Sequence, residues 1–154
     1  MQTFLPEPDF QLTATILDSK RLFKQVVEAR QILVLLGEKI HKTKEGSILE
    51  EFLQTSMRHK NHPVLKMWHK HIDFLKLYHD FMLLECQSLG IKTALYYLAD
   101  KGYAYFTQEK LPKWFGNKEF HDSHKSNLVR KFPAHYRKYY PDIEDNLPYI
   151  WPEE

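Results

Sequence analysis

Four polar residues near the amino end of the chain have the types and the spacing of a reacting centre. Arg21, Lys24, Gln25 and Glu28 follow one another at intervals of three, one and three residues, so in a helix they share one face. Two cations, an amide and a carboxylate on one face can hold a phosphate beside a reacting atom. The competing interpretation is an ordinary surface ion pair, because Lys24 and Glu28 are one helical turn apart. The residues alone favour the ion pair.

A second group of candidates lies between residues 120 and 140, where basic and aromatic side chains alternate. Basic groups neutralise DNA phosphates, and flat rings stack on displaced bases. Hydroxyl and amide groups can contact phosphate oxygens or base edges. Residue types alone leave DNA contact and an aromatic-rich packing arm equally open. The candidates are His121, Ser123, His124, Lys125, Ser126, Asn127, Arg130, Lys131, His135, Tyr136, Arg137, Lys138, Tyr139 and Tyr140.

Other kinds of site are disfavoured. Cys86 is the only cysteine, so neither an intrachain disulfide nor a thiolate-rich zinc site is expected. His121 and His124 would share a helical face, but no acidic or cysteine partner completes a tetrahedral set by spacing. Cys86 lies in an apolar stretch and is expected to be a buried, unreactive thiol. We therefore expect no metal and no cofactor.

Length and composition limit the fold and the cellular setting. The 154 residues, 43% of them hydrophobic, suit one domain over 1–154 with one core. A formal net charge of +2 does not by itself indicate nucleic acid, although nine histidines can add charge near neutral pH. The amino terminus has no signal-peptide pattern, and no apolar stretch approaches membrane-spanning length. We expect a cytoplasmic protein, cellular or virus-encoded, without a membrane partner.

Helical spacing of apolar residues predicts the elements that position the candidates. Residues 1–16 contain two prolines and are predicted to form an extended arm. A helix is predicted from about Lys20 to a stop at Gly37, with Asp18 or Ser19 as its cap.

Further helices are predicted downstream, giving an all-α fold of about three to five helices with irregular, aromatic-rich termini. A long helix should run from Pro63 to about Gln87 and stop near Gly90. Shorter ones are predicted to open at residues 47–50 and to cover 93–99 and 122–131.

At this point the sequence resembles a known family, the pyrimidine dimer DNA glycosylases of the phage endonuclease V type. The stretch 61–91 resembles the family's central helix, with His62 before it and Glu85-Cys86 shortly before Gly90. Several long motifs in the right order are more specific than any single one. The motifs FLPEPDF, LDSKRLFKQVVEARQIL, NHPVLKMW, FHDSHKSNLVRK and LPYIWP resemble a bacterial and viral branch of the family.

The resemblance implies a compact helical protein that binds duplex DNA with damaged or modified pyrimidines and works as a monomer. In the family, the amino-terminal α-amine attacks the sugar carbon that bears the damaged base. A Schiff base forms, elimination breaks the strand, and a glutamate on the first helix assists. A terminal amine suits this role because its pKa lies near neutrality.

Two positions depart from the family pattern. The phage enzyme exposes a threonine amine, whereas here the amine belongs to Met1, or to Gln2 after methionine removal. Aligning Lys24-Gln25 with the family's Arg-Glu pair puts an amide at Gln25, and Glu28, one turn later, is the other candidate for the carboxylate. The resemblance thus implies catalytic roles for Met1, Gln2, Gln25 and Glu28. It implies DNA-binding roles for Arg21, Lys24, His62, His121, His124, Asn127, Arg130, Lys131, His135 and Tyr136.

Three other functions stay open at this point. One is a DNA-binding protein of the same fold without glycosylase activity, which the amide at Gln25 supports. Another is a glycosylase for a modified pyrimidine other than a photodimer, because pocket shape decides the target. The third is a helical interaction protein that uses its aromatic tail on another protein. That last function predicts no salt-sensitive DNA affinity.

Overall fold

The computed structural model describes residues 1–38, 40, 59–93, 96–99 and 110–153. Within these ranges there are helices and no strands, which confirms the predicted all-α class. The six helices of the described part are α1 (Phe10–Ile16), α2 (Ser19–Leu35), α4 (Pro63–Trp68), α5 (Ile72–Ser88), α6 (Lys118–Lys131) and α7 (Pro133–Tyr136). None of these is long and apolar enough to cross a membrane. The helix predicted to open at 47–50 lies outside the described residues.

Helix α2 forms where the sequence predicts it, and it packs mainly on α5. Its first turn is capped by the Asp18 carboxylate, which accepts a hydrogen bond from the Arg21 N–H. Its last turn closes at Gly37, whose φ of 92° lets the Glu38 N–H reach the Leu33 carbonyl at 3.0 Å. The buried faces of the pair carry Leu22, Val26, Ala29, Ile32 and Leu33 from α2 and Phe74, Leu75, Tyr78, Met82, Leu83 and Cys86 from α5.

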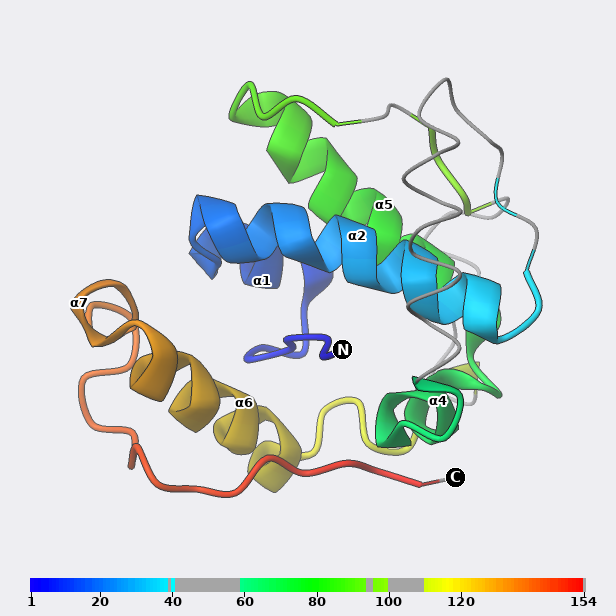
Figure 1. Ribbon diagram of the computed structural model, residues 1–154. Coiled ribbons are helices and arrows are strands. Elements are labelled where there is room, and N and C mark those ends of the chain that lie inside the picture. The colour runs from blue at the N-terminus through cyan, green and yellow to red at the C-terminus, as the bar shows by residue number, and fades with distance from the viewer. Residues whose placement is uncertain (39, 41–58, 94–95, 100–109, 154) are drawn as a thin grey trace.

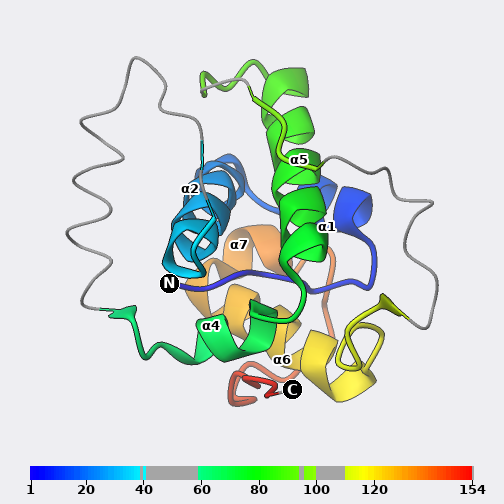
Figure 2. The ribbon, with the colours of Figure 1, turned by 90° about the vertical axis from the view of Figure 1, so that its right-hand side faces the viewer.

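The amino-terminal arm, residues 1–9, runs through the middle of the molecule. Figures 1 and 2 show it between α1, α2 and α5 on one side and α6 and α7 on the other. The prediction that the extended arm reaches residue 16 was wrong. Helix α1 begins at Phe10 because the Asp9 carboxylate accepts a hydrogen bond from the Leu12 N–H at 2.8 Å. The Phe10 ring then packs on Phe74, with ring centroids 4.6 Å apart.

The single long helix predicted from Pro63 is instead two helices, α4 and α5, with a break at His69–His71. In an unbroken helix Trp68 and Phe74 would point about 120° apart. The break lets both rings enter the core, where their centroids lie 6.3 Å apart. The predicted end near Gly90 is confirmed, and this glycine has a φ of 71°.

The short helix predicted over 93–99 is wrong for its described residues, 93 and 96–99, none of which is helical. A carboxylate of α5 explains this. Asp80 accepts hydrogen bonds from the N–H groups of Leu98 and Ala99, at 2.9 and 2.8 Å. These amides are therefore satisfied without a helical turn.

Helix α6 contains the predicted helix 122–131 and begins one turn earlier, because Asn117 accepts a hydrogen bond from the Phe120 N–H at 2.9 Å. Residues 141–153, here called the C-terminal strap, follow α7 without regular structure. Figures 1 and 2 show the strap, in red, running back along α6 towards α4.

Candidate active site

Gln25 holds the backbone of the arm from both directions. Its Oε1 accepts a hydrogen bond from the Phe4 N–H at 2.8 Å, and its Nε2 donates to the Gln2 carbonyl at 3.2 Å. The Tyr78 hydroxyl also lies 2.7 Å from Oε1. Gln25 is only 1% exposed, so each of these bonds forms away from water. The amide both accepts and donates here, whereas an ionised carboxylate has no donor.

Glu28 places a carboxylate beside the first residues of the arm. Its Oε2 accepts hydrogen bonds from the Gln2 N–H at 3.1 Å and from Gln25 Nε2 at 3.4 Å. The Lys24 ammonium is 3.9 Å from Oε1. Burial raises the pKa of Glu28, against the opposing effects of the Gln2 N–H and the positive Met1 amine. The structure therefore brings together all four residues expected to be catalytic.

Thr3 is fixed by two aromatic residues from distant parts of the chain. The Trp68 indole N–H donates to the Thr3 hydroxyl at 3.1 Å. The Tyr149 hydroxyl donates to the Thr3 carbonyl at 2.7 Å. The backbone immediately after the amine is thus held by several hydrogen bonds. Such bonds can keep a candidate nucleophile in one position.

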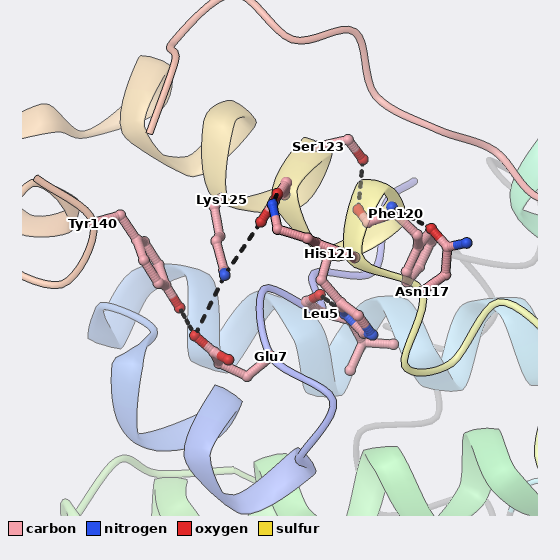
Figure 3. A network of polar contacts seen from close by, with 10 residues as sticks. Leu5, Glu7, Asn117, Phe120, His121, Ser123, Lys125 and Tyr140 are labelled. Carbon is pink, nitrogen blue, oxygen red and sulfur yellow. Dashed lines mark hydrogen bonds and ion pairs between the residues drawn. The ribbon is translucent and has the colours of Figure 1, made fainter. Parts of the chain in front are cut away.

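Two histidines of α6 bind the next part of the arm. His124 Nδ1 accepts a hydrogen bond from the Leu5 N–H at 2.8 Å. His121 Nε2 accepts one from the Gly116 N–H, so its Nδ1, 2.7 Å from the Leu5 carbonyl, carries the proton and donates (Figure 3). Burial lowers the pKa of both rings, that of His124 most strongly. Both are buried, which favours a structural role over the expected DNA contact.

Glu7 connects the far end of the arm to α6 and to the chain beyond α7 through polar contacts. Figure 3 shows the Tyr140 hydroxyl and the Lys125 ammonium converging on it. The hydroxyl donates to Glu7 Oε1 at 2.9 Å, and the ammonium lies 3.9 Å from the same atom. Lys125 also pairs with Asp122 at 3.3 Å. Two further residues of the basic and aromatic segment therefore serve the fold.

His62, half-buried at the start of α4, lies near the amino-terminal amine. Its Nδ1 accepts a hydrogen bond from the Val64 N–H at 3.1 Å, so the proton of the neutral ring is on Nε2. Burial lowers the pKa of His62, and the positive charges of the Met1 amine and of His59 lower it further. These effects favour the neutral form of the ring.

Some of the remaining DNA-binding candidates are exposed to solvent, and others form ion pairs or hydrogen bonds within the protein. Lys131 is exposed, and the Lys24 side chain is 66% exposed. Arg21 pairs with Asp18 at 3.2 Å. Arg130 is exposed, but its Nη1 donates to the Leu147 carbonyl of the strap at 2.9 Å.

The other three candidates are more enclosed. The Tyr136 hydroxyl donates to Asp18 from a buried ring. His135 Nε2 donates to the Ile16 carbonyl at 2.8 Å. Asn127 Oδ1 is buried and has no hydrogen-bond partner among the described residues. Sequence spacing could not distinguish these contacts from surface exposure, because their partners lie far away in the chain.

Residues 1–96 match a family model described as pyrimidine dimer DNA glycosylase. The chain belongs to this family. The match spans the arm and α1, α2, α4 and α5, which carry Gln25, Glu28 and His62. No curated protein and no solved structure matched the chain. Membership makes the protein a DNA repair glycosylase, so its substrate is DNA.

Proposed function

We propose that this glycosylase also has AP lyase activity and acts on pyrimidine dimers, or on other damaged or modified pyrimidines, in duplex DNA. The proposal rests mainly on the buried Glu28 carboxylate, which accepts a hydrogen bond from the Gln2 N–H. The positive charge of the Met1 amine is close enough to affect the pKa of Glu28. A nucleophile and a group that can exchange protons with it are thereby held together.

The proposed reaction begins at the amine. Its lone pair forms a bond to C1′ of the damaged nucleotide as the bond between C1′ and the base breaks, and the base leaves with a proton. Opening of the sugar ring gives the Schiff base, and loss of a C2′ proton then expels the 3′ phosphate. Glu28 takes the proton that the amine releases and passes it to the ring oxygen O4′ as the sugar opens, while the departing base takes its proton from water. The raised pKa of Glu28 brings it closer to the pH at which a carboxylate exchanges protons efficiently.

The geometry serves either candidate amine. The Gln2 nitrogen lies 3.1 Å from Glu28 Oε2, and removal of Met1 would turn this same atom into the α-amine. If Met1 stays, its amine is the nearby positive charge that acts on Glu28. Gln25 is the positioning residue in both cases, because it holds the Phe4 N–H and the Gln2 carbonyl.

DNA contact is assigned to the exposed cations of the two elements beside the site. Lys24 lies between Arg21 and Glu28 on α2, and Lys131 lies at the end of α6. Exposed lysines bind phosphates without reading sequence and make affinity fall with salt. We therefore infer that these residues hold the duplex while the amine acts.

Borohydride trapping tests the proposal. The protein is mixed with duplex DNA carrying one thymine dimer or one abasic site, reduced, and run on a denaturing gel. We expect a covalent band whose peptide map shows the modified residue to be Met1 or Gln2. Glu28→Gln, which keeps an acceptor for the Gln2 N–H, should lose roughly 100-fold or more in trapping rate. Its salt-sensitive DNA binding should be unchanged.

Glu119→Gln is the matched control, because Glu119 is an exposed glutamate in the first turn of α6. It should trap as the wild type does. Normal trapping by Glu28→Gln would refute the role of Glu28. Tight, salt-sensitive binding without any wild-type band on either DNA would replace the proposal with a non-catalytic damage-binding protein.

A further inference from the structure

Helix α4 connects His62 to the arm that carries the amine. His62 is the N-cap of this helix, and at the other end the Trp68 indole N–H donates to the Thr3 hydroxyl at 3.1 Å. The His62 ring also meets Trp151 edge to face, with ring centroids 5.1 Å apart. Trp151 in turn lies 4.2 Å from Tyr149, whose hydroxyl donates to the Thr3 carbonyl. Two separate sets of contacts therefore fix the position of the His62 ring relative to the arm.

The His62 ring lies near the amine without a hydrogen bond to it. The positive charge of the Met1 amine is close enough to lower the pKa of His62. Among the residues that the structure describes, the ring forms one hydrogen bond, which Nδ1 accepts from the Val64 N–H at 3.1 Å. The ring is half-buried, and its Nε2–H is available to a molecule bound beside the amine.

The tautomer of His62 limits the chemistry that this ring can do. Because Nδ1 accepts from Val64 and Nε2 carries the proton, the neutral ring can donate a hydrogen bond but has no lone pair for a substrate proton. In the proposed reaction Glu28 already handles the protons. It is a carboxylate again once it has given its proton to O4′, so it can take the proton that leaves C2′. The negative charge on the departing phosphate is then the remaining charge to be stabilised.

That charge develops when elimination breaks the bond between C3′ and O3′. The electrons of the C2′–H bond form the double bond between C2′ and C3′, and those of the C3′–O3′ bond leave with the phosphate. A singly charged diester thereby becomes a monoester with about two negative charges. A hydrogen-bond donor placed where charge develops lowers the barrier of such a step.

We propose that His62 is a catalytic residue of the elimination step, whose Nε2–H donates a hydrogen bond to the 3′ phosphate as it leaves. The inference rests on the proposed function, because it requires the Schiff base to form at the amine. It assigns the two steps to different groups. Glu28 acts on formation of the Schiff base and on the proton transfers, whereas His62 acts on the departure of the phosphate.

Borohydride trapping and strand cleavage separate these steps on one substrate, a duplex with a single abasic site. Trapping measures the Schiff base, and cleavage without borohydride measures the elimination that follows. His62→Asn keeps a side-chain oxygen that can cap the Val64 N–H but shortens the reach of the donor. Its single-turnover cleavage rate should fall roughly 10-fold to 100-fold, while its trapping rate stays within about two-fold of the wild type. His62→Ser, which also supplies a favoured N-cap, should behave in the same way.

His69→Asn is the matched control. His69 is exposed at the opposite end of α4, and its Nδ1 donates to the Lys66 carbonyl at 2.7 Å. This variant should trap and cleave as the wild type does.

The pH profile tests whether His62 acts as a neutral donor. The ratio of the wild-type cleavage rate to that of His62→Asn should stay constant between pH 7 and pH 8.5, because the neutral ring persists over this range. A ratio that falls towards one would indicate a charged phosphate ligand and overturn the proposal. Equal losses of trapping and cleavage in both His62 variants would overturn it in favour of a structural role, and so would unchanged cleavage. A wild type that forms no trapped band would refute the proposed function, and this role with it.

Discussion

Replacing Gln25 by Glu tests whether the arm is held by an amide and not by a carboxylate. The new side chain could still accept the hydrogen bond from the Phe4 N–H. As an anion it would lose the donations to the Gln2 carbonyl and to Glu28 Oε2, now 3.2 and 3.4 Å away. It would also stand as a second buried negative charge beside Glu28. We expect the variant to be markedly less stable at neutral pH.

The expected loss of unfolding free energy is the smaller of two costs, that of charge repulsion and that of protonating one carboxyl. Two unit charges 3.4 Å apart repel by about 5 kcal/mol at an effective dielectric constant of about 20. Protonating one carboxyl of ordinary pKa costs about 3.7 kcal/mol at pH 7 and restores a donor. The variant should therefore take up a proton and lose roughly 3–4 kcal/mol of unfolding free energy. Since Glu28 and burial raise the pKa of the new carboxyl, the loss should shrink by about 1.4 kcal/mol for each pH unit below 7.

Urea unfolding of the variant and the wild type at pH 7 and pH 5 measures this difference. Gln11→Glu is the matched control, because Gln11 is exposed on α1, and its change should stay within about 0.5 kcal/mol. The reasoning is refuted if Gln25→Glu is as stable as the wild type at pH 7. It is also refuted if the loss grows as the pH falls.

Two further predictions concern buried groups. Burial lowers the pKa of His121 and His124. The unfolded chain therefore binds more protons than the folded protein below about pH 6.5, and the folded protein loses stability as the pH is lowered through this range. Each ring should contribute about 1.4 kcal/mol per pH unit. His124→Gln, which can still accept from the Leu5 N–H, should lower the slope measured by urea unfolding between pH 5 and 6.5 by about 1.4 kcal/mol per pH unit; an unchanged slope would contradict the assignment. Burial raises the pKa of the Cys86 thiol to about 11, so it should resist iodoacetamide at pH 8 until urea unfolds the protein. Mass spectrometry measures the modification, and rapid labelling of the native protein would count against burial.

Much of the local structure could be predicted from the sequence. The cap at Asp18 and the stop at Gly37 bound α2 as expected, and the helical spacing of Gln25 and Glu28 correctly put them on one face. These features depend on residues within one or two turns of each other. The break between α4 and α5 was missed, because it serves the packing of Trp68 with Phe74 and not a local preference.

The resemblance left two carboxylate positions open, and the path of the arm distinguishes them. Gln25 forms hydrogen bonds with the backbone of Gln2 and Phe4. Glu28 accepts a hydrogen bond from the Gln2 N–H and is affected by the charge of the Met1 amine. No spacing within α2 contains that information, because it depends on where residues 1–9 lie.

The same holds for the histidines of α6. Residue types made His121 and His124 equally good ligands for phosphate, but the fold uses both on Leu5, and His124 is 119 residues away from it in the chain. The sequence thus determined the bounds of α2 and which polar groups share its face, because capping and periodicity act over a few residues. Only the tertiary structure decided which groups meet the amine and which are buried, because those contacts depend on how segments distant in the chain pack together.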